Sequence, residues 1–197
     1  MARQRGGIAW LVQAVGIGVL VWGLLLVASP VIAQGPPRIV EPVVANSQRD
    51  LLLFLRLEGA ITPEMESGVQ NGLPVTFVFD VALEMVRTGW PDKEVYSGTF
   101  EHTLAYDSLK RQYSVRTTEN RVENTMTDDL AEAKRLMAEV DGYRVLPLAG
   151  LQSDREYVLR VKGTVVRKTL PFSFRSLIPF TGARSVETDW RRVEFRY

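Results

Sequence analysis

Hydrophobic residues alternate with polar ones over much of the chain after residue 50, with the period of two that is typical of β-strands. Leucine occupies every odd position from Leu51 to Leu57, and the alternation is longest from Leu73 to Met85. This second segment places seven apolar side chains on one face: Leu73, Val75, Phe77, Phe79, Val81, Leu83 and Met85. Residues 95–106 and 112–118 alternate as well. These segments predict an antiparallel meander with one covered face.

Two segments break the alternation and predict short helices. Thr62-Pro63-Glu64 supplies a capping side chain, a first-turn proline and an acid at the positive end of the helix dipole, and Asn71-Gly72 is expected to end this helix. Over 128–141 apolar residues recur at helical spacing behind Thr127, the predicted N-cap, and Gly142 is expected to end the second helix.

Strands are predicted again over 143–148, 156–168 and 192–197, and Pro147 favours an edge position for the first of them. Helices that do not alternate with strands argue against an α/β fold. The pattern therefore predicts a mainly β domain that follows an N-terminal hydrophobic helix. Its expected form is an antiparallel β-sandwich or a curled sheet of about six to seven strands, with one or two short helices.

The hydrophobic helix belongs to a predicted targeting segment over residues 1–33. Arg3 and Arg5 precede an uncharged apolar run from Ile8 to Val27, and the small residues of Val31-Ile32-Ala33 predict cleavage after Ala33. An uncleaved membrane anchor is the alternative, because about 20 apolar residues suffice to span a bilayer. Under either alternative the positive-inside rule leaves the N-terminus in the cytoplasm and exports the rest. We expect the chain in the bacterial periplasm or at the periplasmic face of the inner membrane.

Residues 34–49 include Gly35-Pro36-Pro37 and lack periodicity, so they predict a linker to a β-rich extracytoplasmic domain over 50–197. Hydrophobic residues make up 46% of the chain and charged residues 24%, a composition typical of globular and not of disordered proteins. Cysteine is absent, which excludes disulfides, thiolate metal sites, covalent haem attachment and a lipoprotein anchor.

The formal net charge of +1 conceals an asymmetry along the chain. Residues 41–142 carry 10 basic and 18 acidic side chains, a net of −8, whereas 143–197 carry 11 and 5, a net of +6. Nucleic acid is not expected as a partner of an exported chain that is nearly neutral overall. We expect most of these charges on solvated strand faces, with an anionic membrane surface or protein partner as the alternative.

The residues offer little for catalysis. His102 is the one histidine, and its position between Phe100 and Leu104 predicts a satisfied, partly buried side chain. A single histidine is too few for a histidine zinc site, and no Gly-x-Ser-x-Gly motif occurs. We therefore predict no catalytic residue, no metal site and no cofactor. An unrecognised carboxylate site is the alternative, and its candidate acids are Asp80, Glu84, Glu101 and Asp107.

A basic strand face is the candidate contact surface. Arg160, Lys162 and Lys168 alternate with apolar residues over 156–168, so they share the face opposite to the predicted core. Three like charges on one strand face create a local field that would attract anionic lipid or an anionic partner.

Several short motifs, taken in their order and spacing, resemble a bacterial family of exported proteins catalogued as domain of unknown function 4390. The motifs are Asn71-Gly72-Leu73-Pro74-Val75-Thr76-Phe77, His102-Thr103-Leu104-Ala105-Tyr106-Asp107-Ser108-Leu109, Arg111-Gln112-Tyr113, Leu130-Ala131-Glu132-Ala133 and Thr188-Asp189-Trp190. The resemblance runs from about Leu51 to the C-terminus. It implies an N-terminal signal or anchor and a β-rich body, and it supplies no catalytic residues. Family members are often encoded beside a two-component sensor kinase, which suggests an envelope-signalling role by association alone.

Together these observations predict a non-enzymatic binding or accessory module at the periplasmic face of the inner membrane, with an inner-membrane protein such as a sensor kinase, or anionic lipid, as its partner. The alternative is a hydrolase or lyase that uses an unrecognised carboxylate site. The oligomeric state is not determined by the sequence.

Overall fold

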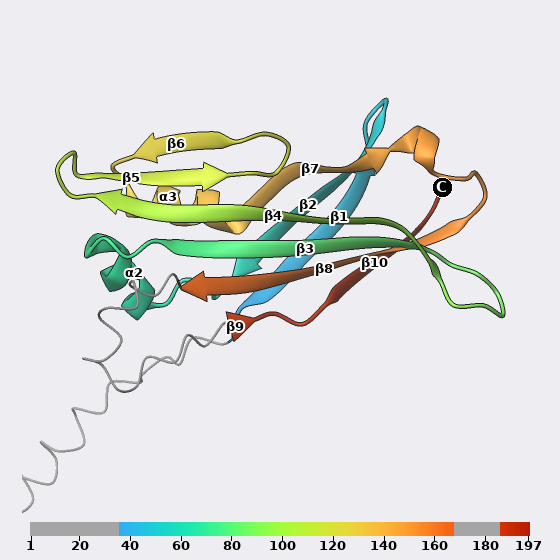
Figure 1. Ribbon diagram of the computed structural model, residues 1–197, viewed down its shortest axis with the longest axis horizontal. Coiled ribbons are helices and arrows are strands. Elements are labelled where there is room, and N and C mark those ends of the chain that lie inside the picture. The colour runs from blue at the N-terminus through green and yellow to red at the C-terminus, as the bar shows by residue number, and fades with distance from the viewer. Residues whose placement is uncertain (1–35, 168–185) are drawn as a thin grey trace, which may run out of the picture. The chain divides into compact units, whose positions relative to one another are not determined.

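The computed structural model describes residues 36–167 and 186–197, which form two antiparallel β-sheets and two short α-helices (Figure 1). The small sheet has the order β1-β2-β7, with β1 at Arg38–Asn46, β2 at Asp50–Glu58 and β7 at Glu139–Pro147. Figure 1 shows its strands crossing behind those of the large sheet. The predicted N-terminal hydrophobic helix and targeting segment lie outside the described residues.

The large sheet has the order β10-β8-β3-β4-β5-β6, and β9 also pairs with β8. Its strands are β3 (Val75–Met85), β4 (Lys93–Asp107), β5 (Gln112–Thr117), β6 (Glu123–Thr127), β8 (Glu156–Arg167), β9 (Val186–Glu187) and β10 (Arg191–Arg196). Helix α2 (Pro63–Gln70) joins the two sheets, α3 (Leu130–Ala138) follows β6, and the 3-10 helix η1 (Leu148–Gly150) follows β7. The mainly β, antiparallel, two-layer prediction is confirmed. The described residues contain ten strands, more than the predicted six to seven, because β1, β6 and β9 carry no alternating pattern.

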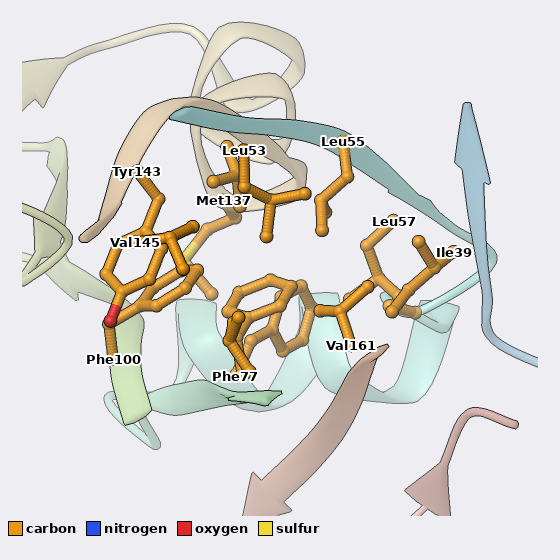
Figure 2. Packing of buried hydrophobic residues seen from close by; sticks show 14 of the residues in the cluster. Ile39, Leu53, Leu55, Leu57, Phe77, Phe100, Met137, Tyr143, Val145 and Val161 are labelled. Carbon is orange, nitrogen blue, oxygen red and sulfur yellow. The ribbon is translucent and has the colours of Figure 1, made fainter. Parts of the chain in front are cut away.

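The core lies between the two sheets, where the alternating apolar faces meet. All four leucines at odd positions of β2 are buried, and Figure 2 shows Leu53, Leu55 and Leu57 on the side of the core opposite Phe77 of β3. Phe79 stacks on Phe100 of β4 with ring centroids 4.9 Å apart, and Phe100 also contacts Tyr143 of β7 at 4.3 Å. Figure 2 also shows Ile39 of β1, Met137 of α3, Val145 of β7 and Val161 of β8 in this cluster. Leu73 is an exception to the predicted core face, because it precedes β3 and is exposed.

Helix α2 forms as predicted. The Thr62 hydroxyl accepts a hydrogen bond from the Met65 N–H, Pro63 begins the helix and Asn71 ends it. Met65 and Val69 are buried against the core, so an amphipathic face holds this short helix in place. Neither helix in the described ranges has the length and apolar character required to cross a membrane.

Strand β1 shows that the predicted linker over 34–49, and a domain that begins at residue 50, were wrong. β1 pairs with β2 from Arg38 opposite Glu58 to Asn46 opposite Leu51. Ile39 is its one buried residue, and a bulge at Glu41–Pro42, where Glu41 has a φ of 50°, interrupts the register. An edge strand that is bulged and solvated on most of its length has no reason to alternate, which explains why its sequence resembles a linker.

Helix α3 begins two residues later and ends three residues earlier than predicted. Asp129, not Thr127, is the N-cap, since its carboxylate accepts the N–H of Ala131 at 2.8 Å. Gly142 does not end the helix. It lies inside β7 with a φ of 81°, at a bulge between the pairs Leu53–Tyr143 and Phe54–Asp141. The sequence misled because Val140 continues the helical spacing of α3 but is buried as part of β7.

Candidate functional site

A groove of about 490 Å³ lies where the inner face of β5 and β6 meets α3 and β7. The inner face changes character along β5. Tyr113 and Val115 are buried in the core, but the next inward position is Thr117, and its neighbours on β6 are Glu123 and Thr125. Polar residues at inward positions mean that this part of the sheet is solvated. The walls are completed by Arg135 and Leu136 of α3 and by Glu139, Asp141 and Arg144 of β7.

The groove carries both signs of charge in exposed ion pairs. Arg121 lies 2.5 Å from Glu123, and Arg135 lies 2.7 Å from Glu139. The two arginine side chains are 82% and 56% exposed. Such surface pairs contribute about 0–1 kcal/mol, so a bound molecule can displace one partner at little cost. Asp141 also lines the groove and forms no ion pair with another described residue.

Glu119 connects this groove to the core through His102. The histidine is fully buried, and its Nε2 lies 2.7 Å from Glu119 Oε1. Nδ1 lies 3.1 Å from the Met137 carbonyl, which can only accept, so Nδ1 carries a hydrogen. Nε2 makes no hydrogen bond of good geometry to another described residue, so its approach to Glu119 is a close polar contact only. The prediction of a satisfied, partly buried histidine was therefore wrong: the side chain is fully buried, and its Nε2 lacks a hydrogen bond of good geometry to a described residue. His102 contacts Glu119 but does not line the groove itself.

Asn120 closes one end of the groove by joining the β5–β6 loop to β7. Its side-chain amide donates to the Gly142 carbonyl at 2.9 Å, and its carbonyl accepts the N–H of Arg144 at 2.7 Å. The Asn120 side chain thus forms hydrogen bonds with backbone groups at the bulge of the edge strand β7. The bulge and the loop that carries Glu119 are held together by the same residue.

The predicted contact residues lie elsewhere, on the outer face of the large sheet. Arg160 forms an ion pair with Glu84, and Lys162 lies 3.2 Å from Glu187. Both cations also flank the Trp190 ring, at 5.9 and 5.4 Å from its centroid. Their charge is therefore compensated locally. Lys168 lies outside the described residues, and a role of these three residues in partner or lipid contact stays a prediction.

The four candidate acids of the alternative site also lie on this outer face, on β3 and β4. Asp80 accepts a hydrogen bond from Thr99, and Asp107 caps the β4–β5 turn by accepting the N–H groups of Leu109 and Lys110. Glu101 lies opposite Val78 in the register. These hydrogen bonds, and the ion pair of Glu84 with Arg160, account for Asp80, Asp107 and Glu84 as local structural groups. Within residues 36–167 and 186–197, no cluster of three or more carboxylate or histidine side chains is arranged to hold a metal ion.

The sequence did not identify the groove. Its lining comes from β5, β6, α3 and β7, and β6 lacks the alternation that marks a strand. The one usable signal is the change from Tyr113 and Val115 to Thr117 at successive inward positions of β5. That signal becomes interpretable only when the pairing partners on β6 are known.

Comparison with known proteins identifies one family for this fold. A family model described as "Domain of unknown function (DUF4390)" matches residues 36–194, which include every described strand from β1 to β9 and most of β10. No curated protein and no solved structure matched the chain.

Proposed function

Because the chain belongs to the family of this domain of unknown function, whose description assigns no activity, we propose a function from the site itself: a non-enzymatic binding or accessory module at the periplasmic face of the inner membrane. The groove between β5, β6, α3 and β7 is the proposed binding site. Its partner is an inner-membrane protein such as a sensor kinase. A role in envelope signalling is part of the proposal.

The charge arrangement of the groove is the observation that carries this proposal. Arg121 and Glu123 are paired with each other, and Arg135 shares Glu139 with Arg56, so the exposed arginines can exchange these weak pairs for groups of a ligand. His102, the side chain best suited to acid–base chemistry near pH 7, is fully buried beneath Glu119 and cannot touch a bound molecule. The groove is therefore suited to recognition, in which charged side chains set specificity, more than to proton transfer.

The proposed location follows from the N-terminal sequence. Arg3 and Arg5 ahead of an apolar run support export of the domain. A reporter that is active only outside the cytoplasm, fused after Tyr197, should be active. Sequencing of the mature N-terminus separates the two targeting alternatives: a chain that begins at Gln34 indicates a cleaved signal, and retention of Met1 indicates an anchor. A cytoplasmic C-terminus would contradict the proposal.

Site-specific photo-crosslinking in the native envelope tests the binding function. A photoreactive amino acid at Arg144, in the groove, should capture an inner-membrane protein identified by mass spectrometry. Leu109, which is 95% exposed at the opposite end of β5, is the matched control and should not capture it. Equal capture from both positions, or from neither, would contradict a groove-based binding module. A turnover that is lost when Asp80 and Glu84 are replaced would instead favour the hydrolase or lyase alternative.

A further inference from the structure

The edges of the two sheets are protected very unequally in the described residues. β1 is bulged at Glu41–Pro42, and the Arg191 side chain donates to its Ile39 carbonyl at 3.1 Å. β7 ends in Pro147 and is occupied at its bulge by Asn120. β10 carries four charged side chains in its six residues. These are the usual devices that prevent another chain from pairing with an edge strand.

β6 is the less protected edge of the large sheet, because Glu123 is its one charged side chain. Its sequence, Glu-Asn-Thr-Met-Thr, contains no proline, glycine or lysine, and its pairing with β5 has no register shift. Four of its five residues are exposed, and Met126 is among the exposed large hydrophobic side chains. An open edge of this kind is a template for an added strand.

The register shows which backbone groups of β6 are free to pair. The Thr118 N–H donates to the Glu101 carbonyl at 3.0 Å, so even-numbered residues of β5 direct their backbone groups to β4 and odd-numbered ones to β6. The partners of those odd residues on β6 are Glu123, Thr125 and Thr127. Asn124 and Met126 therefore direct their N–H and C=O groups to the open edge.

The charge around this edge indicates the character of the added strand. The groove lining carries four carboxylates and three arginines: Glu119, Glu123, Glu139, Asp141, Arg121, Arg135 and Arg144. Glu123 and Thr125 belong both to β6 and to the lining of the groove, so a strand added to β6 lies along the groove. The three arginines of the lining are already paired with Glu123, Glu139 and Asp50, whereas Asp141 has no ion-pair partner among the described residues. The carboxylate left over favours lysine or arginine at inward positions of the added strand.

We propose that β6 is the docking edge for an extended, basic segment of a partner polypeptide, which pairs with Asn124 and Met126 and places alternate cations along the groove. This inference rests on the proposed binding function and names the chemistry of its partner. A second copy of this chain, paired through its own β6, is disfavoured as the occupant, because the sequence of β6 contains no lysine or arginine to place along the groove.

The test measures binding of a peptide to the full-length chain in detergent, with fluorescence anisotropy at low salt as the readout. The probe is a labelled peptide of about ten residues with lysine at alternate positions and threonine or valine between them. It should bind, weaken as salt is raised, and bind at least tenfold more tightly than a matched peptide with glutamate in place of lysine. Equal binding of the two peptides would overturn the charge argument.

Two further arms test strand pairing. Met126→Pro removes an outward N–H without removing a β5–β6 hydrogen bond, and it should weaken binding at least tenfold, whereas Met126→Thr should not. N-methylation of alternate peptide amides should have the same effect as the proline, and it leaves the protein unchanged, so it decides the matter if Met126→Pro fails to fold. Binding that survives N-methylation in both possible registers would overturn the proposal, as would self-association of the chain through β6.

The outcome separates this inference from the proposed function. Capture of an inner-membrane protein from Arg144 together with no peptide binding at β6 would refute the docking edge and leave the binding module standing. Absence of capture in the native envelope would refute the binding module, whatever the peptide does.

Discussion

Gly98 lies near the middle of β4, facing the core where the hydroxyl groups of Tyr96 and Tyr143 meet. The two oxygens are 2.5 Å apart, and Tyr143 belongs to β7 of the opposite sheet, so this hydrogen bond links the two layers. A methyl group at position 98 would overlap the Tyr96 hydroxyl and lie 2.7 Å from that of Tyr143. Gly98→Ala must therefore displace the tyrosine pair.

The expected cost follows from what the displacement leaves behind. Tyr96 is only partly buried and can turn outward, but Tyr143 is 5% exposed and would keep a hydroxyl group without its partner. A buried polar group that loses its hydrogen bond costs about 1–3 kcal/mol. Replacing glycine by alanine inside a strand recovers about 0.5–1 kcal/mol of backbone entropy. We expect a net destabilisation of about 1–2 kcal/mol.

Gly163 of β8 is the matched control, because it lies in the interior of the same sheet without the clash. A methyl group there would be 3.5 Å from Leu57 Cδ1 and 3.6 Å from Thr188 Cγ2, which are ordinary van der Waals distances. Gly163→Ala should be neutral or stabilise the domain by up to about 1 kcal/mol. The two alanine variants should therefore change stability in opposite directions.

Urea unfolding of the domain from residue 36 onward, followed by far-ultraviolet circular dichroism, measures both effects. The midpoint should fall for Gly98→Ala and stay or rise for Gly163→Ala, with the slope of each transition unchanged. A Gly98→Ala midpoint at or above that of the parent protein would show that the tyrosine pair does not hold the two layers together as described.

Three further predictions follow from single residues. Burial, and then the hydrogen bond that the neutral hydroxyl makes with Tyr96, raise the pKa of Tyr143, so its contribution to stability is complete below about pH 10, where a tyrosine in the unfolded chain ionises. Above that pH the free energy of unfolding of the parent protein should fall by up to about 1.4 kcal/mol per pH unit because of this group. Urea titrations at alkaline pH should show that Tyr143→Phe lacks this fall. Phe77→Asp should unfold the domain, because an unpaired charge at this fully buried site costs several kcal/mol against a total stability of about 5–15 kcal/mol, and native circular dichroism in this variant would contradict the described core. Asn120→Ala should accelerate hydrogen exchange of the Arg144 amide and lower the free energy of unfolding by about 1 kcal/mol, because the amide loses its acceptor. Unchanged exchange would show that the Asn120 side chain does not hold β7.

The parts of the fold that could be predicted are those with one buried face. β2, β3 and β4 alternate because their inward side chains meet the other sheet, and α2 could be recognised because Thr62 and Pro63 act through local geometry. β1 and β6 are edge strands, exposed over most of their length, so burial places no periodic constraint on their residues. The boundary between α3 and β7 was missed because Val140 is buried in either conformation.

The candidate site was beyond prediction for a different reason. Glu119 and His102 are 17 residues apart, and they meet because β4 and β5 pair so that Thr117 lies opposite His102. Arg160 and Lys162 were placed on the correct outer face by alternation, but their partners Glu84, Glu187 and Trp190 come from other elements. The local field inferred from the strand alone omitted those neighbouring charges.

By itself, then, the sequence determined which strand faces are buried, where α2 begins, and which chemistries a chain without cysteine and with one histidine lacks. Those properties depend on neighbours in the sequence or on composition, so a single chain displays them directly. The tertiary structure alone decided that β6 is an open edge, that a polar groove runs beside it, that Glu119 rests on a buried imidazole, and that Gly98 must have no side chain. Each of these depends on the register between strands that are far apart in the sequence, and register is determined by the packing of both sheets together.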